Sequence, residues 1–245
     1  MFSLYSTKLN EFTSMNDKTK ILGSFANPFA SSEITEPISD HWKLRRRMAA
    51  AVHAITETLV TCIPSNEELE EMAKTLEKIN SVLETSERKF GLLEFVADGN
   101  HGGHGEMNHE HNAIGGFSNP LSPGINIWVE GTKAFGTTEC GFAYEGPPGH
   151  IHGGYVAAIL DQFLGMAQVA GGNPGMTGKL EIRYLKPTPL NTKLQLEAEV
   201  SRIDDRKTRV SGQIFANNNT TAKAEGLFIR PTHFNLQDLS LKFEN

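Results

Sequence analysis

The segment best suited to chemistry is a loop rich in glycine and histidine that leads into an apolar helix. Residues 146–154 read Gly-Pro-Pro-Gly-His-Ile-His-Gly-Gly, in which the prolines fix φ and the glycines permit positive φ. Residues 155–171 predict a helix that is apolar on almost every face, which is typical of a buried helix. One carboxylate, Asp161, lies in its middle. Because a buried carboxylate is costly unless it is paired or hydrogen-bonded, Asp161 is the first candidate functional residue.

The start of the same helix offers a second functional group. His152, Gly153 and Gly154 stand where a helix presents unpaired backbone N–H groups and a partial positive charge. This arrangement suits an oxyanion that develops during acyl transfer, and glycines let a ligand approach the backbone. The alternative interpretation is that the glycines only permit the turn into the helix and close packing. For Asp161 the alternative is a structural carboxylate held by backbone N–H or hydroxyl groups.

Gly153 and Asp161 are too far apart to touch one substrate carbonyl within one chain. Asp161 lies eight residues beyond Gly153, which is about 12 Å along a helix that rises ~1.5 Å per residue. If both act on one thioester, two chains must supply them, with their central helices side by side and antiparallel. The spacing therefore predicts a homodimer with composite sites at the interface. His152 is predicted on the helix face opposite Asp161, where we expect it to cap the loop rather than act directly in catalysis.

Two helices are predicted before this segment. Helical periodicity begins at Asp40 and ends before Pro64, and a second helix starts at Ser65 with Glu68 as a capping-box partner. They predict a helical hairpin, docked on the main domain or on a partner subunit. Residues 1–39 are polar and predict an extended arm or disordered lead.

Residues 97–124 predict a long loop, which we interpret as a mobile lid or linker. Its histidines could ligate Zn²⁺ or Ni²⁺, but their spacings match no standard site, so we expect no metal and no cofactor. Cys140 is predicted to be a core residue, since no base is placed to activate it. The loop histidines that could ligate a metal are His101, His104, His109 and His111.

The rest of the chain predicts strands that surround the apolar helix. Alternating apolar residues mark two strands before the helix and four after it, joined by short turns that favour antiparallel pairing. The architecture is therefore α+β, with a sheet wrapped around one long helix so that all faces of the helix are buried. Residues 125–231 form this domain, and residues 232–245 are a polar tail. The predicted strands are 125–129, 134–144, 179–185, 192–203, 208–216 and 221–230.

The composition excludes several classes of function. A chain of 245 residues with a formal net charge of −6 has no basic footprint for nucleic acid. We interpret the basic run at Lys43, Arg45, Arg46 and Arg47 as the solvated face of a helix. No stretch approaches the ~20 apolar residues of a membrane span. Two cysteines make no disulfide framework, and Met1–Lys20 lacks the pattern of a secretory signal, so we expect a cytoplasmic location.

Taken together, these motifs resemble one family. The chain carries, in order, His152-Gly-Gly, Asp161, Lys179-Leu-Glu-Ile-Arg-Tyr-Leu-Lys-Pro187 and Asp205-Arg-Lys207. This order is similar to that of hotdog-fold acyl-CoA thioesterases of the PaaI/THEM type, in the 4-hydroxybenzoyl-CoA thioesterase-like superfamily. The resemblance covers roughly residues 118–231. The helical hairpin and the histidine-rich loop lie outside it.

The resemblance implies a reaction and a set of site residues. It implies hydrolysis of a fatty or aryl acyl-CoA thioester, with Asp161 as general base or nucleophile. Backbone N–H groups of Gly153 or Gly154 would hold the thioester oxygen, and the Thr177 hydroxyl would orient water or Asp161. Basic side chains suit the phosphates of CoA, and the positions implied for CoA are Arg183, Leu185, Lys186, Arg206 and Lys207.

One departure from the family keeps other functions open. Several members carry Asn or Gln a few residues before His-Gly-Gly, where this chain has Gly146-Pro-Pro-Gly149, with Glu145 and His150 the only nearby polar side chains. A non-catalytic acyl-CoA-binding or regulatory protein is therefore the second hypothesis. A hotdog dehydratase or hydratase is a weaker third, because those enzymes pair Asp and His closely. The sequence leaves open the acyl class, and whether the protein is a dimer or a dimer of dimers.

Overall fold

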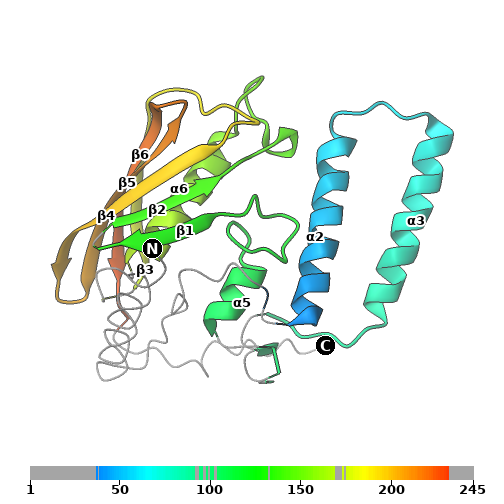
Figure 1. Ribbon diagram of the computed structural model, residues 1–245, viewed down its shortest axis with the longest axis horizontal. Helices are drawn as coiled ribbons and strands as arrows, with labels where there is room; N and C mark the ends of the chain where they lie inside the picture. The colour runs from blue at the N-terminus through cyan, green and yellow to red at the C-terminus, as the bar shows by residue number, and fades with distance from the viewer. Residues whose placement is uncertain are drawn as a thin grey trace, which may run out of the picture.

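The computed structural model describes residues 37, 39–91, 94–95, 98, 100–101, 104–131, 133–168, 173 and 175–231. These residues form a six-stranded antiparallel sheet with a long helix against one face, and a helical hairpin stands beside them (Figure 1). The predicted arm (apart from residues 37 and 39) and the tail at 232–245 lie outside the described residues. No described helix combines the length and apolarity needed to cross a membrane.

The strand order places the strand that follows the long helix at an edge of the sheet. The order is β1-β2-β4-β5-β6-β3, so β3 pairs with β6 on one side only. The second predicted strand was too long, since β2 ends at Thr138 and a short 3-10 helix, η1 (Phe142–Tyr144), follows. The strands are β1 (Asn126–Glu130), β2 (Lys133–Thr138), β3 (Met176–Tyr184), β4 (Leu194–Asp204), β5 (Lys207–Ala216) and β6 (Asn219–Ile229).

The core lies between the sheet and α6 (Gly153–Ala167). Phe163 and Leu164 of α6 are fully buried, and they pack with strand residues that alternate between buried and exposed, such as Leu194 and Leu196 of β4. This alternation is what a sheet with one buried face requires. The described helix is shorter than the predicted one, and residues 169–172 lie outside the description.

The prediction that every face of the helix is buried is wrong. The face of α6 that carries Gly153, Ala157 and Asp161 is only half-buried. The reason is that β3 lies at the sheet edge, and seven of its nine residues are exposed. Asp161 is therefore a partly exposed carboxylate in the single chain, beside an unpaired strand edge.

The predicted hairpin consists of α2 (Asp40–Leu59) and α3 (Asn66–Glu84). The capping box between Ser65 and Glu68 is confirmed, with both reciprocal hydrogen bonds present. α2 docks on the main domain and buries Trp42 and Ala49, whereas no residue of α3 is buried.

The segment at 97–124 contains a helix, α5 (His104–His111), in place of the predicted mobile lid or linker. Met107 is fully buried, Glu110 is 1% exposed, and the Phe117 N–H donates to the His109 carbonyl at 2.8 Å. These buried contacts anchor the segment, which explains why its glycine-rich composition was misleading. Residues 97, 99, 102 and 103 lie outside the described chain.

Candidate active site

The start of α6 leaves one backbone donor open. His152 is the N-cap, and its Nδ1 accepts the Gly154 N–H at 3.0 Å, which confirms the predicted capping role. The N–H groups of Tyr155 and Val156 donate to the His152 carbonyl. The Gly153 N–H has no acceptor within the described chain. Of the two glycines predicted to hold an oxyanion, Gly153 is thus the one whose N–H is available to a ligand in this conformation.

Tyr184, at the end of β3, contacts Gly153 through both its hydroxyl and its ring. Its hydroxyl donates to the Gly153 carbonyl at 2.9 Å. Its ring lies against Gly153, since a Cβ at that glycine would be 3.7 Å from the ring. The Gly153–Gly154 peptide is therefore held at its carbonyl by Tyr184 and at its N–H by His152. Sequence reasoning missed this contact, although the alternation of Leu180, Ile182 and Tyr184 assigns all three to one face of the strand.

The carboxylate of Asp161 has the partner that was predicted for it. The Thr177 hydroxyl donates to Asp161 Oδ1 at 3.0 Å. Thr177 lies near the start of β3, directly before an irregularity in the pairing of β3 with β6. A hydrogen bond to one carboxylate oxygen fixes the orientation of the group and leaves the other oxygen free to accept a proton.

These contacts form two separate half-sites, one at each end of β3. The first is Gly153 with Tyr184, and the second is Asp161 with Thr177. Thr177 and Tyr184 are about 23 Å apart along an extended strand at ~3.3 Å per residue. The single chain therefore does not bring the oxyanion donor and the carboxylate together, as their spacing in the sequence predicted.

The basic residues implied for CoA binding also lie in two groups, one at each end of β3. Lys186 directly follows β3, near the Gly153 half-site, and its Nζ donates to Asn219 Oδ1 at 2.8 Å. Arg206 and Lys207 lie at the opposite end, because Lys207 and Met176 both pair with Ile229. Each end of β3 therefore has its own basic residues.

Arg183 is the one implied CoA residue that points elsewhere. It lines a hollow of about 360 Å³ together with Glu181, Glu197 and Lys223. Glu197 alternates with the buried Leu196, so this hollow is on the side of the sheet away from α6. Leu185 is exposed directly after β3, and its N–H donates to the Thr221 carbonyl.

The loop before α6 uses its polar side chains internally. Glu145 accepts the Gly149 N–H at 2.7 Å, and Gly149 adopts a positive φ of 76° that favours glycine. His150 Nδ1 lies 2.8 Å from the Pro148 carbonyl. The two side chains that could replace the missing Asn or Gln thus each use one polar atom to shape the loop.

The hairpin braces this loop through η1. Glu57 of α2 accepts the Ala143 N–H at 3.0 Å, and its carboxylate occupies the space where a side chain at Gly141 would stand. The Tyr144 ring lies edge-on to Tyr155 of α6, with centroids 4.7 Å apart. Cys140 is buried as predicted, and burial raises the pKa of its thiol to about 12, so it stays protonated and unreactive.

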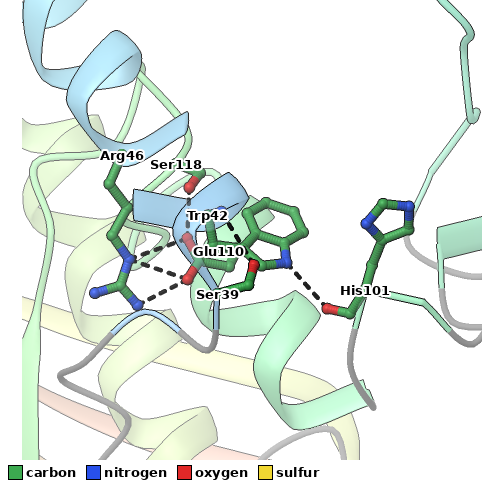
Figure 2. Close-up of polar contacts among 6 residues, drawn as sticks. All are labelled: Ser39, Trp42, Arg46, His101, Glu110 and Ser118. Atoms are coloured by element: carbon green, nitrogen blue, oxygen red, sulfur yellow. Dashed lines mark hydrogen bonds and ion pairs between the residues drawn. The ribbon is translucent and has the colours of Figure 1, made fainter. Parts of the chain in front are cut away.

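A buried ion pair fixes α2 to the domain (Figure 2). Arg46 donates to both carboxylate oxygens of Glu110, and Ser118 donates to the same carboxylate. Beside it, the Trp42 indole N–H donates to the His101 carbonyl at 3.0 Å. The interpretation of the basic run as a solvated face is wrong for Arg46, whose side chain is 16% exposed.

Comparison with known proteins gives an independent line of evidence. The profile of the thioesterase superfamily matches residues 148–223. The acyl-coenzyme A thioesterase THEM4 of Rattus norvegicus is 36% identical over 92 residues, which are 37% of this chain and 40% of that protein. The acyl-coenzyme A thioesterase THEM5 of Homo sapiens is 31% identical over 88 residues, covering 35% of this chain and 36% of that protein. The matched regions therefore span well under half the length of these curated relatives.

One solved structure matches over a larger share of the chain. It is a thioesterase superfamily protein, 30% identical, with a TM-score of 0.65, and the match covers 80% of this chain and 97% of the other. This share is larger than residues 125–231, so the similarity extends beyond the domain that contains the sheet.

Proposed function

Because this chain belongs to the thioesterase superfamily and has its hotdog fold, we propose that it hydrolyses an acyl-CoA thioester to a free acid and CoA. The observation that carries the proposal is the open N–H of Gly153 at one end of an exposed edge strand and the oriented carboxylate of Asp161 at the other. A donor for an oxyanion and a base for water are the two groups that thioester hydrolysis needs.

The two half-sites become one site if two copies pair along β3. An edge strand presents unpaired N–H and C=O groups, and a two-fold axis through the middle of β3 would join two such strands antiparallel. Each Gly153 half-site would then lie next to the Asp161 half-site of the other copy. The same operation would bring Lys186 of one copy towards Arg206 and Lys207 of the other. A single symmetry operation would thus join the catalytic half-sites and also the CoA-binding residues. This supports the proposal of a homodimer.

Each residue then has a role in the reaction. The Gly153 N–H stabilises the negative charge that develops on the thioester oxygen. Asp161 accepts a proton from water as the water oxygen attacks the carbonyl carbon, or it attacks that carbon itself and forms a mixed anhydride, which water then hydrolyses to the free acid and the Asp161 carboxylate. The C–S bond breaks as the tetrahedral intermediate collapses, and the CoA thiolate leaves and takes up a proton. Thr177 keeps the Asp161 carboxylate oriented through its hydroxyl.

Asp161→Asn tests the proposal. The amide oxygen still accepts from the Thr177 hydroxyl, so we expect the fold to be kept while turnover of acyl-CoA falls by two or more orders of magnitude. Thiol release measured across short, long and aromatic acyl-CoAs gives the rate and the substrate class together. Turnover like that of the wild type, in a variant with an unchanged melting curve, would exclude this role for Asp161.

A second candidate function is acyl-CoA binding without turnover. The observation that favours it is that the loop carries no Asn or Gln, and that Glu145 and His150 each use one polar atom in a hydrogen bond within the loop. Calorimetric titration of the wild-type protein with acyl-CoA separates the two candidates. Tight binding without release of thiol decides for the binding protein.

A further inference from the structure

α2 reaches the segment that leads into α6 through the carboxylate of Glu57. One carboxylate oxygen accepts the Ala143 N–H at 3.0 Å, and the other lies where a Cβ at Gly141 would stand. Ala143 is the middle residue of η1. The 3-10 helix is therefore held by a side chain that comes 86 residues earlier in the sequence.

η1 is joined in turn to the residues on both sides of Gly153. The Tyr144 carbonyl accepts the His152 N–H at 2.9 Å. The Tyr144 ring lies edge-on to the Tyr155 ring, with centroids 4.7 Å apart. His152 directly precedes Gly153, and Tyr155 follows it by two residues. A shift of Tyr144 would therefore be felt on both sides of the proposed oxyanion donor.

Tyr144 can transmit such a shift because it is itself closely held. It is 3% exposed, and its hydroxyl donates to the Leu121 carbonyl at 3.0 Å. His53 lies one turn before Glu57 on α2. Its ring centroid is 5.9 Å from that of Tyr144, and its Nδ1 is 3.1 Å from the Pro120 carbonyl. α2 thus contacts both Tyr144 and the segment that binds the Tyr144 hydroxyl.

α2 can serve as the support because a buried ion pair docks its other end. Arg46 and Glu110 form that pair, and the Glu110 side chain is 2% exposed. Arg46 lies eleven residues before Glu57, which is about 16 Å along a helix that rises ~1.5 Å per residue. Figure 1 shows α2 between α3 and the domain. One straight helix therefore connects the buried pair to η1.

We propose, building on the function proposed above, that Glu57 is a positioning residue of the thioesterase reaction. It acts through η1 and Tyr144 to place the Gly153 N–H and does not itself contact the substrate. An oxyanion donor must be aimed at the charge before that charge develops, so a small displacement of the donor lowers the rate. The hairpin thereby contributes to one half-site, that of Gly153, and not to that of Asp161.

Two substitutions of Glu57 test the hydrogen bond. Glu57→Ala removes the acceptor of the Ala143 N–H, and kcat for acyl-CoA should fall about tenfold, as expected for one hydrogen bond to a charged group. KM should stay nearly constant, because no residue implied for CoA is altered. Glu57→Gln keeps an oxygen acceptor, although the bond loses its charge, and its kcat should stay within about threefold of the wild type. Glu71→Ala, at an exposed carboxylate of α3, is the matched control.

Two outcomes of these kinetics would overturn the proposal. Wild-type kcat in Glu57→Ala would mean that the bond does not position the donor. An equal loss in Glu57→Gln would mean that the charge of Glu57 matters and the hydrogen bond does not.

Mixed dimers show which half-site Glu57 supports. With Asp161→Asn in the partner, one site carries neither substitution, so about half of the wild-type turnover is expected. With Gly153→Pro in the partner, which removes the N–H itself, both sites have a damaged Gly153 half-site, and about one twentieth is expected. The mixed dimer of Asp161→Asn with Gly153→Pro is the reference. Recovery in the reference, together with equal turnover of Glu57→Ala in both pairings, would overturn the proposal.

Amide hydrogen exchange tests the same linkage without turnover. In Glu57→Ala the His152 N–H, whose acceptor is the Tyr144 carbonyl, should exchange about tenfold faster, whereas the amides of β5 should not change. Unchanged exchange at His152 would overturn the proposal even in an active enzyme. Faster exchange at His152 in a protein that releases no thiol, or whose reference dimer does not recover, would support the linkage and count against the proposed function or its composite site alone.

Discussion

In the proposed mechanism Gly153 acts through its backbone N–H and not through a side chain, so the informative substitution is one that removes the N–H. Proline is tolerated at the first residue of a helix, and His152, with φ −58° and ψ 133°, has the backbone that a residue before proline prefers. We expect Gly153→Pro to lower kcat for acyl-CoA by about 10²–10³-fold with the helix intact. Steady-state kinetics and circular dichroism measure the two effects.

Gly153→Ala is the matched control for that substitution. It keeps the N–H, and its Cβ would make an ordinary contact 3.7 Å from the Tyr184 ring. Activity close to that of the wild type is expected. If the proline and alanine variants lose the same activity, the effect comes from bulk at this position and not from the donor.

Tyr184 is expected to act through the peptide that it holds. Tyr184→Phe keeps the ring against Gly153 but removes the hydrogen bond to the Gly153 carbonyl. One hydrogen bond contributes about 1 kcal/mol, so kcat should fall about fivefold with little change in KM, while the melting temperature should fall by no more than a few degrees. Tyr155→Phe, which keeps the edge-on contact with Tyr144, is the control. Equal changes in kcat and KM in the Tyr184 variant would contradict a positioning role.

At the scale of elements, the Arg46–Glu110 pair decides whether α2 stays docked. The Glu110 side chain is 2% exposed, so removal of its partner leaves a buried charge unpaired. We expect Arg46→Met to lower the free energy of unfolding by about 3–5 kcal/mol. Arg47→Met, on an exposed position of the same helix, should change it little. Urea denaturation gives both values.

A double variant distinguishes the cost of the unpaired Glu110 charge from the loss of packing by the Arg46 side chain. In the Arg46→Met background, Glu110→Gln removes the unpaired charge while keeping the shape and a partner for Ser118. Most of the lost stability should return. A double variant as unstable as Arg46→Met would show that the Arg46 side chain stabilises by packing, for example over the Phe117 ring, where its guanidinium lies 4.7 Å from the centroid.

The sequence predicted those elements whose cause is local. The hairpin follows from helical periodicity and the Ser65 capping box, and the strands follow from alternation. α5 and the pairing of Arg46 with Glu110 could not be predicted, because they depend on a contact across 64 residues. The Thr177–Asp161 contact was reached through the family resemblance, whereas the Tyr184–Gly153 contact depends on how the strand end meets the helix start.

At the scale of the whole molecule, the proposed composite site predicts that two inactive variants restore activity when combined. Asp161→Asn and Gly153→Pro damage different half-sites. In a mixed dimer, one site carries both substitutions and the other carries neither. The purified mixed dimer should therefore show about half of the wild-type turnover, and an unseparated random mixture about one quarter.

Co-expression of the two variants with different affinity tags allows the mixed dimer to be purified and assayed. Each variant alone provides the baseline. Turnover in the mixed species no higher than that baseline would mean that each chain supplies a complete site, or that the two copies do not pair along β3.

The bond between Glu57 and the backbone of η1 bears on how this protein could have changed over evolutionary time. The carboxylate comes from the hairpin, and the N–H comes from the segment that leads to the loop before α6. A recombination event that joined this sheet to a relative without the hairpin would leave Ala143 without its acceptor and Gly141 uncovered. Exchange of the hairpin and the loop before α6 as one unit would therefore disturb the structure less than exchange of either part alone.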